Sequence, residues 1–142
     1  MSTCPSRSIL LVEDDEQLRR VLAREFRTAG HECVSAGSGE RALAAWQGRA
    51  FDLLVTDIRL PGLDGVELAA SICCSEHVPV ILITGYRRDF SSKLACLAHA
   101  VVVEKPFPVR KLVALAGKVV APVQIAPENG VHAEQQAAER AP

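Results

Sequence analysis

Asp57 is the residue whose type and position most clearly suggest chemistry. It closes an apolar, β-prone run at 52–57, and the turn dipeptides Pro61-Gly62 and Asp64-Gly65 follow it. A buried strand that ends in an acid is unfavourable unless the carboxylate is solvated or paired. What Asp57 can do therefore depends on which groups the fold brings to it.

Polar groups also follow three other apolar runs of the chain. These are Glu13-Asp14-Asp15 after the run 8–12, Thr84 after the run 78–83 and Lys105 after the run 100–103. Each has an ordinary structural explanation when taken alone, such as a favourable acidic charge before a helix or a lysine on the surface. The carboxyl ends of parallel strands lie at one edge of a sheet, so the complete set favours a single site.

This set of groups fits the chemistry of phosphoryl transfer. Carboxylates held close together need a cation, and hard oxygen ligands favour Mg²⁺ or Mn²⁺. Mg²⁺ usually takes one or two carboxylates and leaves positions for phosphate oxygens. The hydroxyl of Thr84 and the ammonium group of Lys105 both suit a phosphoryl group. We therefore expect Asp57 to attack phosphorus while Mg²⁺ and Lys105 neutralise the developing charge.

Alternating strands and helices are predicted to position these groups. Short, continuous apolar runs predict buried strands at 8–12, 33–36, 52–57, 78–83 and 100–103. Apolar residues at helical spacing predict helices over 18–29, 42–46, 66–73, 90–98 and 109–119, with Ser38 and Asp64 as N-caps of the second and third. This alternation indicates an α/β fold, an open, doubly wound parallel sheet with helices on both faces.

The length and composition of the chain limit the remaining possibilities. Its 142 residues fit a flexible N-terminus at 1–7, one domain at 8–120 and a mobile tail at 121–142 that is rich in Ala, Pro, Gln and Glu. A formal net charge of −1 gives no reason to expect nucleic-acid or membrane binding. Five irregularly spaced cysteines and the absence of a long apolar run or signal region predict a reduced, cytoplasmic protein.

The chain resembles the CheY-like receiver domain of two-component response regulators. The resemblance covers residues 8–120 and is carried by Leu11-Val12-Glu13-Asp14-Asp15, by 55–65, by Ile83-Thr84-Gly85 and by Glu104-Lys105-Pro106-Phe107. It implies a flavodoxin-like fold with strand order 2-1-3-4-5. It also implies that Asp57 accepts a phosphoryl group from a histidine kinase or a histidine phosphotransfer protein.

The resemblance assigns individual roles to the metal-binding residues. Asp14 would bind Mg²⁺ directly, Glu13 would bind it through water, and Asp57 and the backbone carbonyl of Arg59 would be further ligands. Thr84 would bond the phosphoryl group and shift on activation. Lys105 would pair with the phosphoryl oxygens, and its peptide bond to the following proline is typically cis in this family.

Three positions, Val102, Tyr86 and Arg59, bear on how the chain compares with the family pattern. Val102 stands where the family usually has the aromatic residue that couples to the threonine, so the route by which the signal leaves the site is expected to differ. Tyr86 and Arg59 occupy places that influence access of water to the aspartyl phosphate in this family. A bulky Tyr86 beside a cationic Arg59 predicts slow autodephosphorylation.

The function expected from the sequence is a stand-alone receiver that signals through phosphorylation-dependent protein contacts. Such a domain is not a classical enzyme, although it assists its own phosphorylation and dephosphorylation. The alternatives are a phosphorelay shuttle to a histidine phosphotransfer protein, a small Mg²⁺-dependent phosphatase and a purely structural receiver. Arg59 argues against the phosphatase, because such enzymes commonly place a second aspartate there. The complete set of site residues argues against a purely structural role.

Several other residues are given structural or docking roles. Kinase choice is expected to depend on the exposed face of the first helix, with Gln17, Arg19, Arg20 and Arg24. The four histidines are expected at the surface or in loops, and Trp46 is expected to pack on a helix face or in the core.

Overall fold

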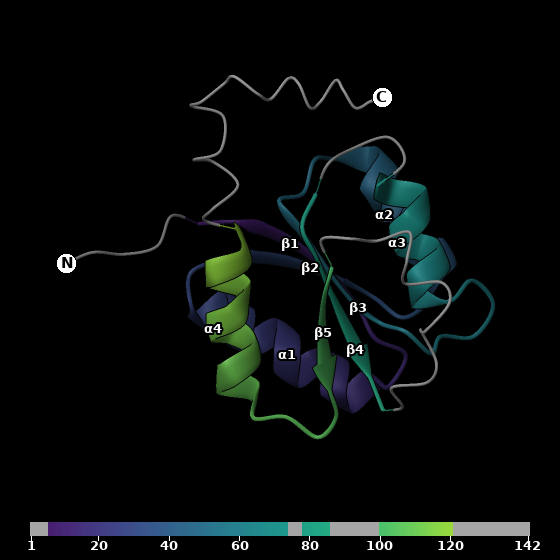
Figure 1. Ribbon diagram of the computed structural model, residues 1–142. Coiled ribbons are helices and arrows are strands. Elements are labelled where there is room, and N and C mark those ends of the chain that lie inside the picture. Colours follow the sequence, from purple (N-terminus) through teal and green to yellow (C-terminus); the bar gives the residue numbers. More distant parts are fainter. Residues whose placement is uncertain (1–5, 74–77, 86–99, 121–142) are drawn as a thin grey trace, which may run out of the picture.

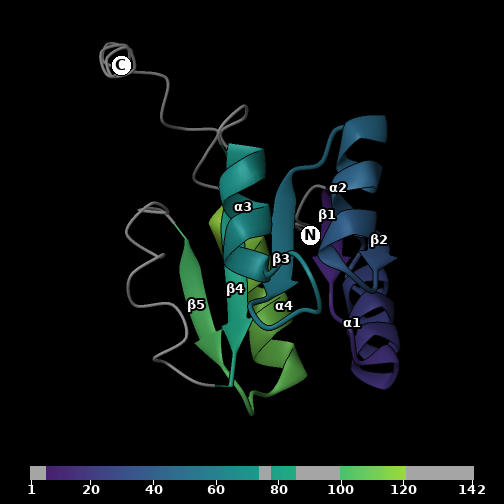
Figure 2. The same cartoon turned by 90° about the vertical axis from the view of Figure 1, so that its right-hand side faces the viewer.

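A five-stranded parallel sheet forms the centre of the protein. The computed structural model describes residues 6–73, 78–85 and 100–120. Its strands are β1 (Ser8–Val12), β2 (Glu32–Ala36), β3 (Leu53–Asp57), β4 (Val80–Thr84) and β5 (Val101–Glu104). Its helices, within these residues, are α1 (Glu16–Thr28), α2 (Gly39–Gly48), α3 (Gly65–Cys73) and α4 (Val109–Val120). The strand order is β2-β1-β3-β4-β5, which confirms the predicted α/β, flavodoxin-like topology, and Figure 2 shows β2 and β5 at opposite edges.

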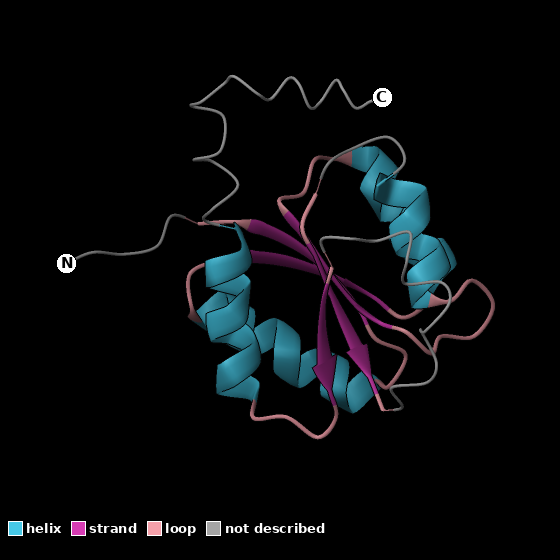
Figure 3. Cartoon of the chain, in the orientation of Figure 1, coloured by secondary structure: helices cyan, strands magenta, loops and turns pink. Residues whose placement is uncertain are grey.

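Helices cover both faces of this sheet. Figures 1 and 3 show α2 and α3 on one side of the strands and α1 and α4 on the other. Successive residues of β1 alternate between the two layers: Leu10 and Val12 belong to the apolar cluster under α2 and α3, and Ile9 and Leu11 to the cluster under α1 and α4. Burial on both faces explains why the strands are continuous apolar runs in the sequence.

The starts of α1, α2 and α3 are each fixed by a side-chain cap. Asp15 accepts hydrogen bonds from the backbone at the start of α1. Ser38 Oγ accepts from the N–H of Arg41 at 3.2 Å, as predicted. Asp64 and Glu67 form a reciprocal capping box at the start of α3, with distances of 2.8 and 3.2 Å. These caps set where the loops beyond β1, β2 and β3 must end.

Differences from the predicted elements are small. β3 begins at Leu53, one residue later than predicted, and β5 includes Glu104. The helix predicted at 90–98 and the tail 121–142 lie outside the described residues. Among the described residues, no helix combines the length and the apolar character that crossing a membrane would require.

Two of the structural assignments can be compared with the fold. Trp46 is buried and its ring lies 5.3 Å from that of Phe51, which confirms its packing role. His31 lies between α1 and β2, as expected for a loop residue, but its side chain is buried and its Nδ1 accepts a hydrogen bond from the N–H of Arg7 at 3.2 Å. The other three histidines lie outside the described residues.

Candidate functional site

Asp57 is the last residue of β3 and is buried, with 4% of its surface exposed. Lys105 Nζ donates to its Oδ2 at 2.9 Å, and the backbone N–H of Arg59 donates to its Oδ1 at 3.2 Å. Both carboxylate oxygens therefore have a donor. This arrangement resolves the cost of ending a buried strand in an acid.

The backbone behind Asp57 is held by its neighbours. Thr56 Oγ1 donates to the carbonyl of Asp57 at 2.9 Å, and the N–H of Gly65 donates to the carbonyl of Ile58 at 2.8 Å. Gly65 lies so close that a Cβ at this position would collide with the carbonyl of Asp57. The glycine is required by this contact, and the start of α3 is thereby seated directly on the end of β3.

Glu13 and Asp14 lie beside Asp57 because β1 pairs with β3. Val12 is in register with Thr56, so the residues that follow them, Glu13 and Asp57, lie side by side at the carboxyl edge of the sheet. Carboxylate oxygens of Glu13, Asp14 and Asp57 all lie within 4.8 Å of one another. Glu13 is 1% exposed, whereas Asp14 is exposed to solvent. The structure thus brings together the three acids that the sequence analysis selected.

The donor set and burial of Glu13 fit a divalent cation. Its Oε2 accepts from the N–H of Asp15 at 3.1 Å, but its buried Oε1 has no hydrogen-bond partner among the described residues. Burial raises the pKa of Glu13 to about 7, and the nearby charge of Asp57 adds to this effect against the opposing bond from Asp15. An oxygen-rich cluster with one unsatisfied buried oxygen is the kind of site that Mg²⁺ or Mn²⁺ can occupy.

Lys105 places its charge between two of the acids. Its Nζ lies 2.9 Å from Asp57 Oδ2 and 3.7 Å from Glu13 Oε1. Partial burial acts to lower the pKa of Lys105, but the hydrogen bond and charge of Asp57 outweigh it and raise the pKa above its ordinary value. The side chain is therefore a cation at neutral pH. The peptide bond from Lys105 to Pro106 is cis, as the family resemblance implied.

Thr84 lies at the end of the strand next to Asp57. Asp57 is in register with Ile83, which places Thr84 one residue further along β4. Thr84 is fully buried, and its carbonyl accepts from the N–H of Lys105 at 2.7 Å. The pairing of β4 with β5 thus carries Thr84 and Lys105 to the same edge of the sheet as the acids.

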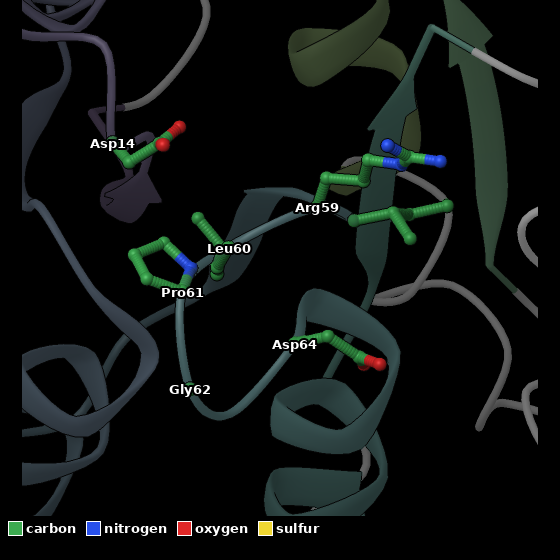
Figure 4. Close-up of a pocket in the computed structure, with 7 residues that line it drawn as sticks. Asp14, Arg59, Leu60, Pro61, Gly62 and Asp64 are labelled. Carbon is green, nitrogen blue, oxygen red and sulfur yellow. The ribbon is translucent and has the colours of Figure 1, made fainter.

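An open pocket of about 570 Å³ borders Asp14, one of the three clustered carboxylates (Figure 4). Asp14 lines one side of it, and the loop from Ile58 to Gly62, together with Asp64, lines the other. Figure 4 shows Asp14 across the pocket from Pro61 and Leu60. The pocket gives access to the acidic edge from solvent, next to the backbone of Arg59.

Two contacts near the site were not predicted from the sequence. Arg19, expected on the exposed docking face of α1, is only half-exposed, and its Nη1 donates to the carbonyl of Glu13 at 2.9 Å. The sequence did contain a signal for this contact. Arg19 lies one helical turn after Asp15, and from there a long side chain can reach back to the loop before the helix. Glu40 Oε2 accepts from the N–H of Leu63 at 3.1 Å, and no local signal joins residues so far apart. Tyr86, by contrast, lies outside the described residues.

A parallel 2-1-3-4-5 sheet with three acids and a lysine at its carboxyl edge is the arrangement of a receiver domain. Residues 9–116 match the response regulator receiver domain family, and the chain belongs to that family. As a receiver domain it is a signalling domain of two-component systems rather than a classical enzyme.

Individual relatives support the same family. The chain is 37% identical to the response regulator protein FleR of Pseudomonas aeruginosa over 112 residues, which are 78% of this chain and 24% of FleR. It is 32% identical to the sensory transduction protein RegX3 of Mycolicibacterium smegmatis over 108 residues, which are 75% of this chain and 47% of RegX3. The chain thus spans less than half the length of these curated relatives.

A solved structure shows the same fold. The CheY-like response regulator receiver domain protein of Methanospirillum hungatei superposes with a TM-score of 0.77 at 24% identity, over 85% of this chain and 98% of that one. This likeness shows that the two proteins share the arrangement of strands and helices.

Proposed function

We propose that Asp57 accepts a phosphoryl group from a histidine kinase or a histidine phosphotransfer protein, with Mg²⁺ or Mn²⁺ as the cofactor. The observation that carries this proposal is the placement of Asp57, buried at the end of β3, 2.9 Å from a lysine ammonium and within 4.8 Å of two further carboxylates. A carboxylate presented in this way can act as a nucleophile toward phosphorus when its surroundings neutralise the incoming charge.

The residues divide the work as follows. A carboxylate oxygen of Asp57 forms the new bond to phosphorus, and the bond from phosphorus to the donor imidazole breaks with its electron pair passing to nitrogen. Lys105 and the hydroxyl of Thr84 bind the phosphoryl oxygens. Asp14, Glu13, Asp57 and the backbone carbonyl of Arg59 would hold the Mg²⁺, whose charge offsets that of the transferring group.

Replacement of Asp57 tests this proposal directly. Asp57→Asn should take up no phosphoryl group from labelled acetyl phosphate in the presence of Mg²⁺, because the side-chain amide is not a nucleophile. Asp52→Asn is the matched control, since Asp52 is exposed at the opposite end of the same strand and its amide oxygen can still accept from the N–H of Ser8. Labelling of Asp57→Asn at the level of wild type would refute the phosphoacceptor assignment.

The proposed output is a phosphorylation-dependent protein contact. Phosphorylation adds a charge of about −2 at Asp57, and Thr84 and Lys105 are expected to move toward it. The exposed α1 residues Gln17, Arg20 and Arg24 are the proposed kinase contacts. The proposed location is the cytoplasm, where the five irregularly spaced cysteines would be reduced.

A phosphorelay shuttle is the second candidate, and Val102 favours it. Val102 is half-buried in β5 opposite Leu82 and packs against the apolar cluster under α2 and α3, in place of the aromatic residue of the usual relay. A shuttle needs no such relay, because its output is the phosphoryl group itself. Transfer of label from the phosphorylated chain to the histidine of a phosphotransfer protein would support the shuttle. If the phosphorylated chain keeps its labelled phosphoryl group in the presence of every phosphotransfer protein of the same genome, output through protein contacts remains as the proposal.

A further inference from the structure

The connection between β2 and α2 contacts the loop that carries Glu13 and Asp14. The carbonyl of Ala36 accepts from the N–H of Glu13 at 3.1 Å. On the other side of the same residue, Arg19 Nη1 donates to the carbonyl of Glu13 at 2.9 Å. The Arg19 guanidinium in turn lies against Gly37, where a Cβ would be 3.0 Å from Nη1. Both backbone polar groups of Glu13 are therefore held.

The first turn of α2, directly after this connection, contacts the loop that carries Arg59. Glu40 Oε2 accepts from the N–H of Leu63 at 3.1 Å. Gly62 has a φ of +74°, and a Cβ there would lie 2.7 Å from the same Glu40 oxygen. A Cβ on Gly39 would lie 2.6 Å from the carbonyl of Leu63. The first turn of α2 and the tip of this loop are therefore in direct backbone contact.

We propose that Arg19 and Glu40 are positioning residues that, through the segment Gly37–Glu40, fix the separation of the two metal-binding loops. Neither side chain would touch the metal. Arg19 sets the peptide between Glu13 and Asp14, and Glu40 sets the loop that presents the carbonyl of Arg59. This inference rests on the proposed function of these loops as Mg²⁺ ligands.

The physical reason is the strict geometry of magnesium. Mg²⁺ requires near-octahedral coordination at about 2.0–2.1 Å, so ligands from separate loops must be held at a defined separation. Groups that orient ligands without binding the metal commonly change metal affinity on the order of 10- to 100-fold when they are replaced. Here the two loops share one support, the segment Gly37–Glu40. The loop after β3 is hydrogen-bonded to it through Glu40, and Arg19, which is hydrogen-bonded to the loop after β1, packs against Gly37 of the same segment.

Arg19 has a matched control on its own helix. Arg20 is the next residue, with a side chain that is 77% exposed and paired only at the surface with Glu16. Isothermal titration calorimetry with Mg²⁺ should give a Kd that rises on the order of tenfold in Arg19→Gln. Arg20→Gln makes the same change of charge and should leave the Kd within about twofold of wild type.

Glu40 can be tested with a pair of substitutions at one position. Glu40→Ala removes the acceptor for the N–H of Leu63 and should raise the Kd for Mg²⁺ on the order of tenfold. Glu40→Gln keeps an acceptor oxygen while removing the charge, and should restore the affinity nearly to wild type. In amide hydrogen exchange, Leu63 should be protected in wild type and in Glu40→Gln and lose protection in Glu40→Ala.

The outcomes separate this inference from the proposed function. Wild-type affinity in folded Arg19→Gln and Glu40→Ala would overturn the positioning role. So would equal losses in Arg19→Gln and Arg20→Gln, or in Glu40→Ala and Glu40→Gln. Asp14→Asn should not bind Mg²⁺, whatever the Arg19 and Glu40 variants show. Binding of Mg²⁺ by Asp14→Asn would count against the proposed metal site itself. If Arg19→Gln does not fold, Arg19→Lys and the Glu40 pair provide the same comparison.

Discussion

At the scale of single residues, Lys105 offsets the repulsion between the buried acids at the carboxyl edge of the sheet. Its ammonium lies between Asp57 at 2.9 Å and Glu13 at 3.7 Å, and both acids are buried. Without it, two carboxylates would face one another with no opposite charge. Lys105→Ala should lower the free energy of unfolding by about 1–3 kcal/mol, a figure reduced for the partial exposure of the lysine.

Urea unfolding with and without Mg²⁺ checks this prediction. The loss in Lys105→Ala should be smaller with Mg²⁺ present, because the cation supplies the missing positive charge. Lys111→Ala, at an exposed position of α4, should change stability little under either condition. Equal losses in the two lysine variants would contradict the role given to Lys105.

His31 gives a second residue-scale prediction, concerning pH. Burial and the nearby charge of Arg7 hold the pKa of His31 below its usual value of 6.5. Between that lowered pKa and 6.5 the unfolded chain binds more protons at His31 than the folded one, so the contribution of His31 to stability falls as the pH falls below 6.5. His31→Asn should lose this part of the pH dependence, since an amide oxygen can accept from the N–H of Arg7 without titrating.

The check is to compare the unfolding free energies of wild type and His31→Asn at pH 7.5 and 5.5. Glu13 also titrates in this range, with the opposite sign, because its raised pKa makes the folded chain the stronger proton binder. That contribution is common to both proteins and cancels in the difference. An identical pH dependence in the two proteins would contradict the assignment to His31.

At the scale of elements, two helical glycines should respond oppositely to the same substitution. Gly65 begins α3, and a Cβ there would strike the carbonyl of Asp57, so Gly65→Ala should displace the end of β3. Gly117 lies inside α4, where nothing stands within 4 Å of an added Cβ. Gly117→Ala should therefore stabilise the protein by about 0.5–1 kcal/mol through better helix propensity.

Thermal or urea unfolding measures the change in the free energy of unfolding for both variants, and labelling by acetyl phosphate adds a functional readout. Gly65→Ala should lose about 1–3 kcal/mol, as is typical of overpacking, and should be labelled more slowly because Asp57 has moved. Gly117→Ala should be labelled at the wild-type rate. A stabilising Gly65→Ala would mean that the end of β3 can shift without cost, against the tight seating of α3.

At the scale of the whole molecule, the sequence predicts what local chemistry determines and misses what tertiary contact determines. The strands that are buried on both faces appear as continuous apolar runs, and Ser38 and Asp64 cap helices as predicted. The order of the strands is not a local property, and its prediction came from family resemblance. Helical spacing gives the direction in which Arg19 leaves its helix but not where its long side chain ends. Glu40 meets Leu63 only because α2 and the loop after β3 are packed together.

Magnesium should stabilise the molecule as a whole, because its proposed ligands come from loops after two different strands. A ligand that binds only the folded state at about 100 times its Kd adds about 2.7 kcal/mol, which for a domain of this size raises the Tm by on the order of 10 °C. Thermal unfolding of wild type and Asp52→Asn with and without Mg²⁺ should show this increase. Asp14→Asn should show none, since its amide is a poor ligand at the exposed side of the cluster. An increase retained in Asp14→Asn would place the bound Mg²⁺ away from the carboxyl edge of the sheet, and the acids there would then need another explanation for their proximity.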